Sequence, residues 1–138
     1  MGNPFVHIEL NTGDVDRAKA FYKALFDWKL KDMPMGPGQT YTMLDVGKGT
    51  GGGMMAKPMP SAPTQWLPYV EVADVKKAIA KAEKGGAMIV VPFMPIGENG
   101  SIGIFIDPTG AGLGVWTPAK KKAPAKKKPP AKKKAQRK

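Results

Sequence analysis

Cysteine is absent from this sequence of 138 residues, and histidine occurs only once. The absence of cysteine excludes disulfide bonds, thiolate metal sites and a cysteine nucleophile. Long apolar runs are absent too: the longest covers residues 87–91, far short of the roughly 20 residues that cross a bilayer. The first residues lack a basic segment followed by an apolar stretch, so no signal peptide is expected. These absences predict a cytoplasmic protein without a membrane span.

Acidic residues are absent after Asp107, and this absence divides the chain in two. Before Pro118, eleven acidic residues balance eleven lysines and arginines, so the formal net charge of +11 lies entirely in residues 118–138. This segment repeats lysine triplets separated by alanine and proline, and its like charges repel one another. We therefore predict a folded domain over residues 1–117 and a disordered basic tail over residues 118–138.

The tail carries ten lysines, one arginine and no aromatic residue. Cations on a flexible chain release counterions from a nucleic-acid backbone, which gives weak, salt-sensitive binding without sequence preference. The predicted nucleic-acid contacts are Lys120, Lys121, Lys122, Lys126, Lys127, Lys128, Lys132, Lys133, Lys134, Arg137 and Lys138. The composition is similar to that of linker-histone tails. A solubilising role, or attraction to any acidic surface including membranes, is the alternative interpretation.

The body contains an internal repeat with an offset of sixty residues, since Asp14, Val15, Ala18 and Ala20 recur as Asp74, Val75, Ala78 and Ala80. In both copies an aspartate suited to cap a helix opens a helical pattern. The periodicities predict helices over residues 15–26 and 74–84, and strands over residues 5–11, 28–33, 40–46, 54–56, 65–72, 88–91, 101–106 and 112–116. Each repeat, about 5–56 and 65–116, is thus βαβββ, which predicts an α+β fold.

A glycine-rich stretch between the third and fourth predicted strands matches a nucleotide-binding pattern. Gly47, Gly49 and Gly52 have the spacing of the dinucleotide fingerprint. That fingerprint requires a helix after the last glycine, whereas Pro58 and Pro60 follow soon and oppose one. We therefore interpret the stretch as a connection between strands.

His7 shares one face of the first predicted strand with Glu9, which lies about 6.7 Å away along the strand. The pair has the residue types of a general base and its orienting carboxylate, so His7 and Glu9 are the candidate catalytic residues. Zn²⁺ and related ions usually take three or four protein ligands, and one histidine does not supply them. A neutral histidine with one hydrogen bond, in a half-buried pocket, is the simpler interpretation. We therefore predict no metal site and leave acid–base chemistry open.

Three motifs accompany the doubled βαβββ pattern: Phe5-x-His7-x-x-Leu10, Ala20-Phe21-Tyr22 and Asp107-Pro108-Thr109-Gly110. Together they resemble the vicinal-oxygen-chelate superfamily, which includes glyoxalase I, extradiol dioxygenases and bleomycin-resistance proteins. The resemblance covers residues 5–116 and implies a cleft-bearing sheet built from both repeats.

Metal-using members of that superfamily take one ligand from the first strand and one from the last strand of each half. The resemblance places these positions at His7, about Met54, Leu67 and Gly114. Only His7 among them has a side chain that ligates a divalent cation usefully. Lewis-acid chemistry on a metal is therefore not expected here.

The main expectation is a metal-free domain, without a cofactor, that binds a small, partly apolar molecule in the cleft between the repeats. Aromatic and methionine side chains on several strands supply apolar lining. The predicted ligand contacts are Phe5, His7, Glu9, Met54, Leu67, Tyr69, Gly114 and Trp116. His7 is expected to be the main polar contact, or the base if the site is catalytic.

Two alternatives stay open. One is a metal-dependent glyoxalase-like lyase or isomerase, or a dioxygenase, whose divalent metal is held by ligands not identified in the sequence. The other is a DNA-associated interaction protein in which the body is a passive dimerising module. The sequence also leaves open whether the repeats pair within one chain or between the chains of a homodimer.

Overall fold

The computed structural model describes residues 2–119, which form two α-helices and eight strands. The first repeat runs through β1 (Phe5–Thr12), α1 (Val15–Leu25), β2 (Lys29–Gly36), β3 (Gln39–Asp45) and β4 (Gly52–Ala56). The second runs through β5 (Gln65–Glu71), α2 (Val75–Lys84), β6 (Met88–Pro95), the short 3₁₀ helix η1 (Gly97–Asn99), β7 (Ser101–Ile106) and β8 (Gly112–Thr117). The predicted βαβββ order is confirmed in both repeats, whereas η1 was not predicted. The predicted nucleic-acid contacts at residues 120–138 lie outside the described residues.

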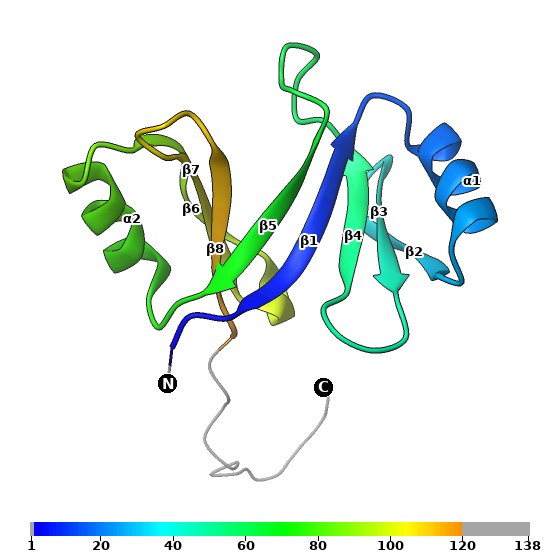
Figure 1. The fold of residues 1–138 in the computed structure, drawn as a ribbon, viewed down its shortest axis with the longest axis horizontal. Helices are drawn as coiled ribbons and strands as arrows, with labels where there is room; N and C mark the ends of the chain where they lie inside the picture. The colour runs from blue at the N-terminus through cyan, green and yellow to red at the C-terminus, as the bar shows by residue number, and fades with distance from the viewer. Residues whose placement is uncertain (1, 120–138) are drawn as a thin grey trace, which may run out of the picture.

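All eight strands belong to one sheet, in the order β2-β3-β4-β1-β5-β8-β7-β6. β1 and β5, the first strands of the two repeats, pair antiparallel at its centre. Each also pairs parallel with the last strand of its own repeat, β1 with β4 and β5 with β8. Figure 1 shows β1 and β5 side by side, with α1 and α2 at opposite ends of the molecule. The two repeats therefore pair with each other within a single chain.

The two edge strands extend further than predicted. β2 and β6 continue past Pro34 and Pro92, where the predicted strands ended. An edge strand has a ladder partner on one side only, so a proline without an N–H group disrupts little there. In β6 the pairing with β7 also shifts register twice, between Ile89 and Val91 and again between Val91 and Met94. The sequence does not reveal which strands lie at an edge, and this explains the early ends.

Each α-helix begins at the aspartate that the repeat pattern identified. The Asp14 side chain accepts a hydrogen bond of 3.0 Å from the backbone N–H of Arg17. The Asp74 side chain accepts one of 3.2 Å from the backbone N–H of Lys77. Caps of this kind are worth about 1 kcal/mol each, so the same local device fixes the start of the helix in both repeats.

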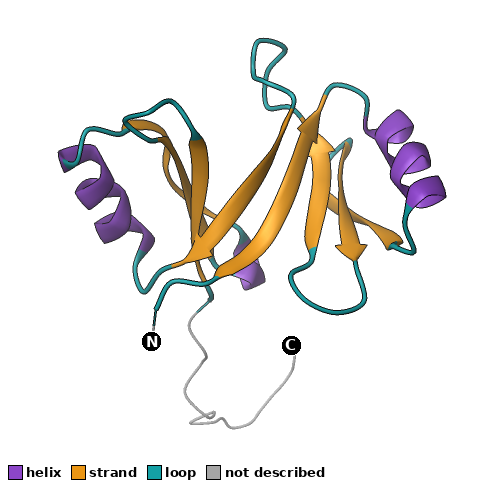
Figure 2. Cartoon of the chain, in the orientation of Figure 1, coloured by secondary structure: helices purple, strands orange, loops and turns teal. Residues whose placement is uncertain are grey.

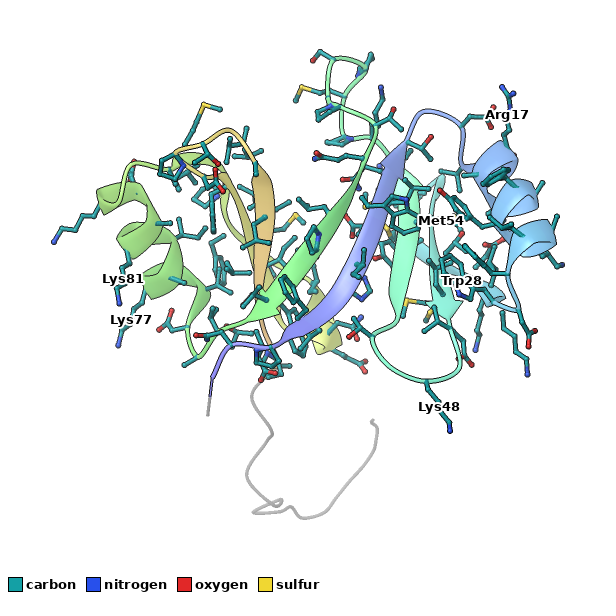
Figure 3. The ribbon with its side chains drawn as sticks, in the orientation of Figure 1. Arg17, Trp28, Lys48, Met54, Lys77 and Lys81 are labelled. Atoms are coloured by element: carbon teal, nitrogen blue, oxygen red, sulfur yellow. The ribbon has the colours of Figure 1, made fainter. Side chains whose placement is uncertain are left out.

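Both α-helices pack on the same face of the sheet, which we call the helical face. Beneath α1, the side chains of Val15, Ala18 and Tyr22 pack against a buried cluster of Leu10, Leu44 and Met54. Beneath α2, Val75 and Ile79 pack against Val115. Figure 2 shows the two helices outside the strands at either end of the sheet. In Figure 3 the labelled Trp28 and Met54 side chains lie on the α1 side of the sheet.

The opposite face carries His7, and we call it the histidine face. Side chains alternate between the two faces of a strand, so His7, Glu9 and Asn11 point away from Leu10 and from α1. Pairing extends this face into the second repeat, because Tyr69 lies opposite His7 and Leu67 lies opposite Glu9. The histidine face therefore joins polar side chains of β1 to the first strand of the other repeat.

The glycine-rich stretch leads directly into β4, so its last glycine in the fingerprint, Gly52, begins a strand. This confirms the interpretation as a strand connection and removes the nucleotide-binding alternative. A built Cβ at Gly52 would also collide with the Ile8 carbonyl of β1, so glycine permits the close pairing of the two strands here.

Within residues 2–119, neither α-helix is long and apolar enough to cross a membrane.

Candidate functional site

Three side chains from both repeats hold the carboxylate of Glu9 on the histidine face. The Tyr41 hydroxyl donates to Glu9 Oε1 at 3.0 Å, and Asn11 Nδ2 donates to Oε2 at 2.9 Å. The Tyr69 hydroxyl, from β5, reaches Oε2 at 3.4 Å. Glu9 is only 8% exposed, so these bonds compensate the loss of water around a buried carboxylate. Glu9 is a polar centre to which β1, β3 and β5 all contribute.

His7 extends this network by one further hydrogen bond. Its Nε2 lies 2.6 Å from the hydroxyl oxygen of Tyr41. A tyrosine hydroxyl has one proton, and that of Tyr41 is directed to Glu9, so the hydroxyl oxygen accepts the bond from Nε2–H of His7. The network thus assigns the proton of the neutral imidazole to Nε2 and leaves Nδ1 with a lone pair. No hydrogen bond among the described residues uses Nδ1.

Burial sets the protonation of the groups around Glu9. It lowers the pKa of His7, and the charge of Glu9 opposes this shift only in part, so the neutral imidazole is favoured. Burial and then the neighbouring Glu9 carboxylate raise the pKa of both Tyr41 and Tyr69. The two hydroxyls therefore keep their protons and act as donors, as the direction of their hydrogen bonds requires.

Each repeat places a tyrosine ring over a glycine of its last strand. A Cβ built at Gly53 in β4 would collide with the ring and hydroxyl of Tyr41. A Cβ built at Gly114 in β8 would collide with the ring of Tyr69. The two rings flank the imidazole of His7, Tyr41 stacked at 6.2 Å between centroids and Tyr69 edge-on at 5.9 Å. The missing side chains of the last strands thus make room for the aromatic walls of the site.

The two halves of the histidine face differ in what covers them. In the second repeat, Ile96 and the η1 segment close over it: Ile96 packs against Leu67, Tyr69 and Ile102, and Trp116 Nε1 donates to the Asn99 carbonyl at 2.6 Å. The first repeat has only a tight turn between β2 and β3 at the equivalent place.

The uncovered half of the face exposes methionines beside the polar network. Met43 and Met33 are 38% and 42% exposed. Met43 pairs with Gly53, and Met33 pairs with Tyr41, so both side chains lie on the histidine face. Methionine side chains are flexible and adapt to varied apolar shapes. The uncovered half of the face therefore carries adaptable apolar side chains, with the exposed Lys31 beside Met43 on the neighbouring strand.

The structure brings together several of the predicted site residues. His7, Glu9 and Tyr69 meet in the network, and Gly114 lies beneath the Tyr69 ring. Leu67 and Trp116 lie on the same face, in the covered half. His7 does not face Leu67, the residue at its matching repeat position, because the antiparallel register pairs His7 with Tyr69.

Two predicted contacts lie elsewhere. Met54 is 0% exposed and packs under α1, because its parallel partner in β1 is Leu10 and it shares the helical face with that residue. Phe5 is 61% exposed, and a register shift at Val6 separates it from the regular alternation that begins at His7. Neither side chain belongs to the network on the histidine face.

Tyr41, Asn11 and Gly53 were not among the predicted ligand contacts, although aromatic side chains on strands were expected to supply lining. Asn11 has a visible signal, since it continues the alternation of His7 and Glu9 along β1. For Tyr41 the signal is weaker, because alternation in β3 groups Tyr41 with Met43 without telling which face they share. The pairing of β3 with β4, and of β4 with β1, settles that question.

The donor set around His7 does not fit a divalent metal. Residues 2–119 contain no group of three or more His, Cys, Asp or Glu side chains close enough to hold one. On the histidine face, the last strands offer Gly53 and Gly114 and the first strand of the second repeat offers Leu67 and Tyr69, so these positions add no carboxylate or imidazole to His7 and Glu9. His7 Nε2 is also hydrogen-bonded to Tyr41.

Comparison with known proteins shows similarity over most of the body. CFP32 of Mycobacterium tuberculosis, named as a candidate glyoxylase, is 35% identical over 114 residues, which are 79% of this chain and 43% of that protein. The same similarity holds for CFP32 of Mycobacterium bovis. The chain thus spans less than half the length of these curated relatives.

Solved structures share the fold at low sequence identity. A hypothetical protein from Bacillus halodurans has a TM-score of 0.66 at 13% identity, over 89% of this chain and 99% of the other. Methylmalonyl-CoA epimerase from Mycobacterium tuberculosis has a TM-score of 0.62 at 18% identity, over 84% of this chain and 88% of the other. These likenesses concern the fold alone. The family profile described as Glyoxalase/Bleomycin resistance protein/Dioxygenase superfamily matches residues 5–115, and with the two paired βαβββ repeats it shows that the chain belongs to this superfamily.

Proposed function

We propose that the uncovered half of the histidine face binds a small, partly apolar molecule. The observation that carries this proposal is the imidazole of His7, which is half-buried between two tyrosine rings. Its Nδ1 has no hydrogen bond among the described residues. Small-molecule sites typically combine apolar lining with a few polar groups in fixed positions. The exposed Met33 and Met43 supply apolar surface on the same face as the imidazole, and Nδ1 supplies one acceptor.

A thermal-shift screen tests the proposal. Small aromatic and branched carbonyl compounds are offered to the wild-type chain, to His7→Ala and to Met59→Ala, an exposed position in the linker between the repeats. Compounds that bind at the site should raise the melting temperature of the wild type and of Met59→Ala, and should act much less on His7→Ala. Equal shifts in all three proteins would show that His7 does not contact the ligand.

We further propose that this binding needs no divalent metal. The support is the donor set: beyond His7 and Glu9, the strand positions around the imidazole carry glycine, leucine and tyrosine. The competing proposal, a metal-dependent lyase, isomerase or dioxygenase, draws on the family name and on the glyoxylase name given to CFP32. Elemental analysis of protein purified without tags or chelators separates them, since near-stoichiometric Ni, Zn, Mn or Fe would overturn the metal-free proposal.

A second function is proposed for residues 118–138, and the carrying observation is that the whole net charge of +11 lies there. We expect salt-sensitive, sequence-independent binding to nucleic acid. Two full-length variants of equal net charge test this: one replaces Lys120, Lys121, Lys122, Lys126, Lys127 and Lys128 by glutamine, and the other replaces Lys23, Lys29, Lys48, Lys77, Lys81 and Lys84. The tail variant should lower the slope of log affinity against log salt by about 5, at roughly 0.9 per cation. Equal slopes in both variants would contradict a role for the tail.

A further inference from the structure

We propose that His7 Nδ1 is a general base that removes a proton from a small, partly apolar carbon acid, with Tyr41 and Glu9 as its positioning residues. The inference rests on the proposed function, because the substrate must occupy the same part of the histidine face. It adds to that function a reaction class, proton abstraction from carbon, and a role for each residue of the network.

The hydrogen-bond chain gives Nδ1 the properties of a base. Nε2–H of His7 donates to Tyr41 Oη at 2.6 Å, and Tyr41 Oη–H donates to Glu9 Oε1 at 3.0 Å. These two hydrogen bonds fix the tautomer, so the lone pair stays on Nδ1, the nitrogen without a hydrogen bond among the described residues. When Nδ1 takes a proton, the ring becomes a cation whose charge is stabilised through Tyr41 by the carboxylate.

Glu9 itself is in a poor position to act as the base. Its side chain is buried, and both oxygens accept hydrogen bonds, from Tyr41, Asn11 and Tyr69. Direct contact with a substrate would require at least one of these bonds to break. The carboxylate is therefore suited to hold Tyr41 in place and to supply negative charge behind the imidazole.

Tyr69 offers a matched control for Tyr41. Both hydroxyls bind Glu9 and both rings flank His7, but only the Tyr41 hydroxyl also contacts the imidazole. Tyr41→Phe removes the hydroxyl that links His7 to Glu9 and leaves the ring over Gly53. Tyr69→Phe removes only the longer bond, of 3.4 Å, to Glu9. The two variants remove the same atom from similar surroundings and differ in its relation to His7.

The first experiment reads the tautomer without any ligand. Because the chain has a single histidine, nitrogen NMR of the full-length protein labelled with ¹⁵N-histidine reports its two ring nitrogens without ambiguity. We expect the proton on Nε2 in the wild type and in Tyr69→Phe, and a mixture of tautomers in Tyr41→Phe. A wild type protonated at Nδ1, or a Tyr41→Phe spectrum identical to the wild type, would overturn the role of Tyr41 and Glu9. Neither result would contradict the proposal that this face binds a small molecule.

The second experiment measures proton abstraction with 5-nitrobenzisoxazole, a small planar carbon acid. In its elimination the C3 proton passes to Nδ1 and the electron pair of that C–H bond forms the nitrile. The N–O bond breaks with its electrons on the phenolate oxygen, and the imidazolium then returns its proton to water. The step needs no oxidant, reductant or metal, and the coloured phenolate is followed by absorbance.

The expected rates separate the base from its positioning residues. His7→Gln should lower kcat/KM about 100-fold, in the range that a positioned base contributes. Tyr41→Phe and Glu9→Gln should each lower kcat about 10-fold with KM little changed, because they act through His7. Tyr69→Phe should lower kcat less than Tyr41→Phe does, because it removes only the 3.4 Å bond to Glu9, and Met59→Ala in the linker should stay within about 2-fold of the wild type. Equal kcat/KM for wild type and His7→Gln, or no acceleration above buffer, would overturn the proposal.

Binding of the same probe, measured by thermal shift, distinguishes the absence of a base from the absence of a binding site. A wild type that is stabilised by 5-nitrobenzisoxazole but eliminates it no faster than His7→Gln has a binding site and no base. A wild type that is neither stabilised nor active contradicts the general base and also counts against this face as a site for small apolar molecules.

Discussion

The imidazole of His7 and the hydroxyl of Tyr41 are joined by a hydrogen bond of 2.6 Å, although they belong to strands that are not neighbours in the sheet. β4 lies between β1 and β3, and Gly53 is its residue beside Glu9 and Met43. Because Gly53 has no side chain, the Tyr41 ring lies across β4 and reaches both His7 and Glu9. The network therefore depends on glycine at position 53 as much as on the side chains that form its hydrogen bonds.

Gly53→Ala should destabilise the fold through this ring. The new Cβ would collide with Tyr41, and overpacking of this kind costs about 1–3 kcal/mol in the free energy of unfolding. Urea denaturation should show that loss, whereas Gly13→Ala, whose Cβ meets only Lys57 Cε at 3.7 Å, should change stability little. In a Tyr41→Ala background the cost of Gly53→Ala should largely vanish. An unchanged cost in that background would place the strain elsewhere.

The pKa of His7 makes stability depend on pH in a defined direction. Because burial holds the folded-state pKa below the ordinary value of 6.5, the unfolded chain binds the proton more readily. The contribution is fully present above pH 6.5 and is lost as the pH falls toward the folded-state pKa. The free energy of unfolding should therefore decrease between pH 7.5 and pH 5.

His7→Gln should flatten this dependence, and chemical denaturation at several pH values measures it. Asp32 and Asp107, whose hydrogen bonds lower their pKa below 3.8, lose their stabilising effect only as the pH falls below that value, outside this window. The same slope in the wild type and in His7→Gln would contradict the assignment of the neutral imidazole to the folded state.

Truncation of two methionines of the first repeat should have opposite effects, one on stability and the other on ligand affinity. Met54→Ala removes a fully buried side chain under α1 and should cost about 2–5 kcal/mol of stability. Met43→Ala removes an exposed side chain on the histidine face, so it should cost far less stability. It should, however, lower the affinity of any ligand found by thermal shift. Ligand affinity that depends on Met54 and not on Met43 would place the ligand away from the proposed face.

Sequence periodicity was sufficient for the repeat, the helix starts and the residues of β1. His7 and Glu9 share a face because alternation has a period of two, and Asp14 and Asp74 mark helix starts because their side chains cap free N–H groups. Both arguments are local, and the structure confirms these element types and helix starts.

Register was not predictable in the same way. Met54 was expected on the histidine face, and the parallel pairing with Leu10 puts it on the other one, since a shift of one residue reverses every side chain of a strand. The bulge at Val6 separates Phe5 from the alternation of β1 by the same logic. Tyr41 reaches the site only through the β3–β4 and β4–β1 pairings, which join residues far apart in the sequence. Site membership thus depends on long-range pairing that local patterns do not contain.

Asn11 provides the last test, because it holds Glu9 from within the same strand. Its Nδ2 donates to Glu9 Oε2 at 2.9 Å, and both side chains are buried. Asn11→Leu leaves that oxygen with only the 3.4 Å contact to Tyr69, and a buried acceptor without its partner costs about 1–3 kcal/mol of stability. In a Glu9→Gln background the cost should be smaller, since the group left without a partner carries no charge. Urea denaturation of the four proteins in this double-mutant cycle measures the coupling, and a coupling free energy of zero would mean that Asn11 stabilises β1 by packing alone.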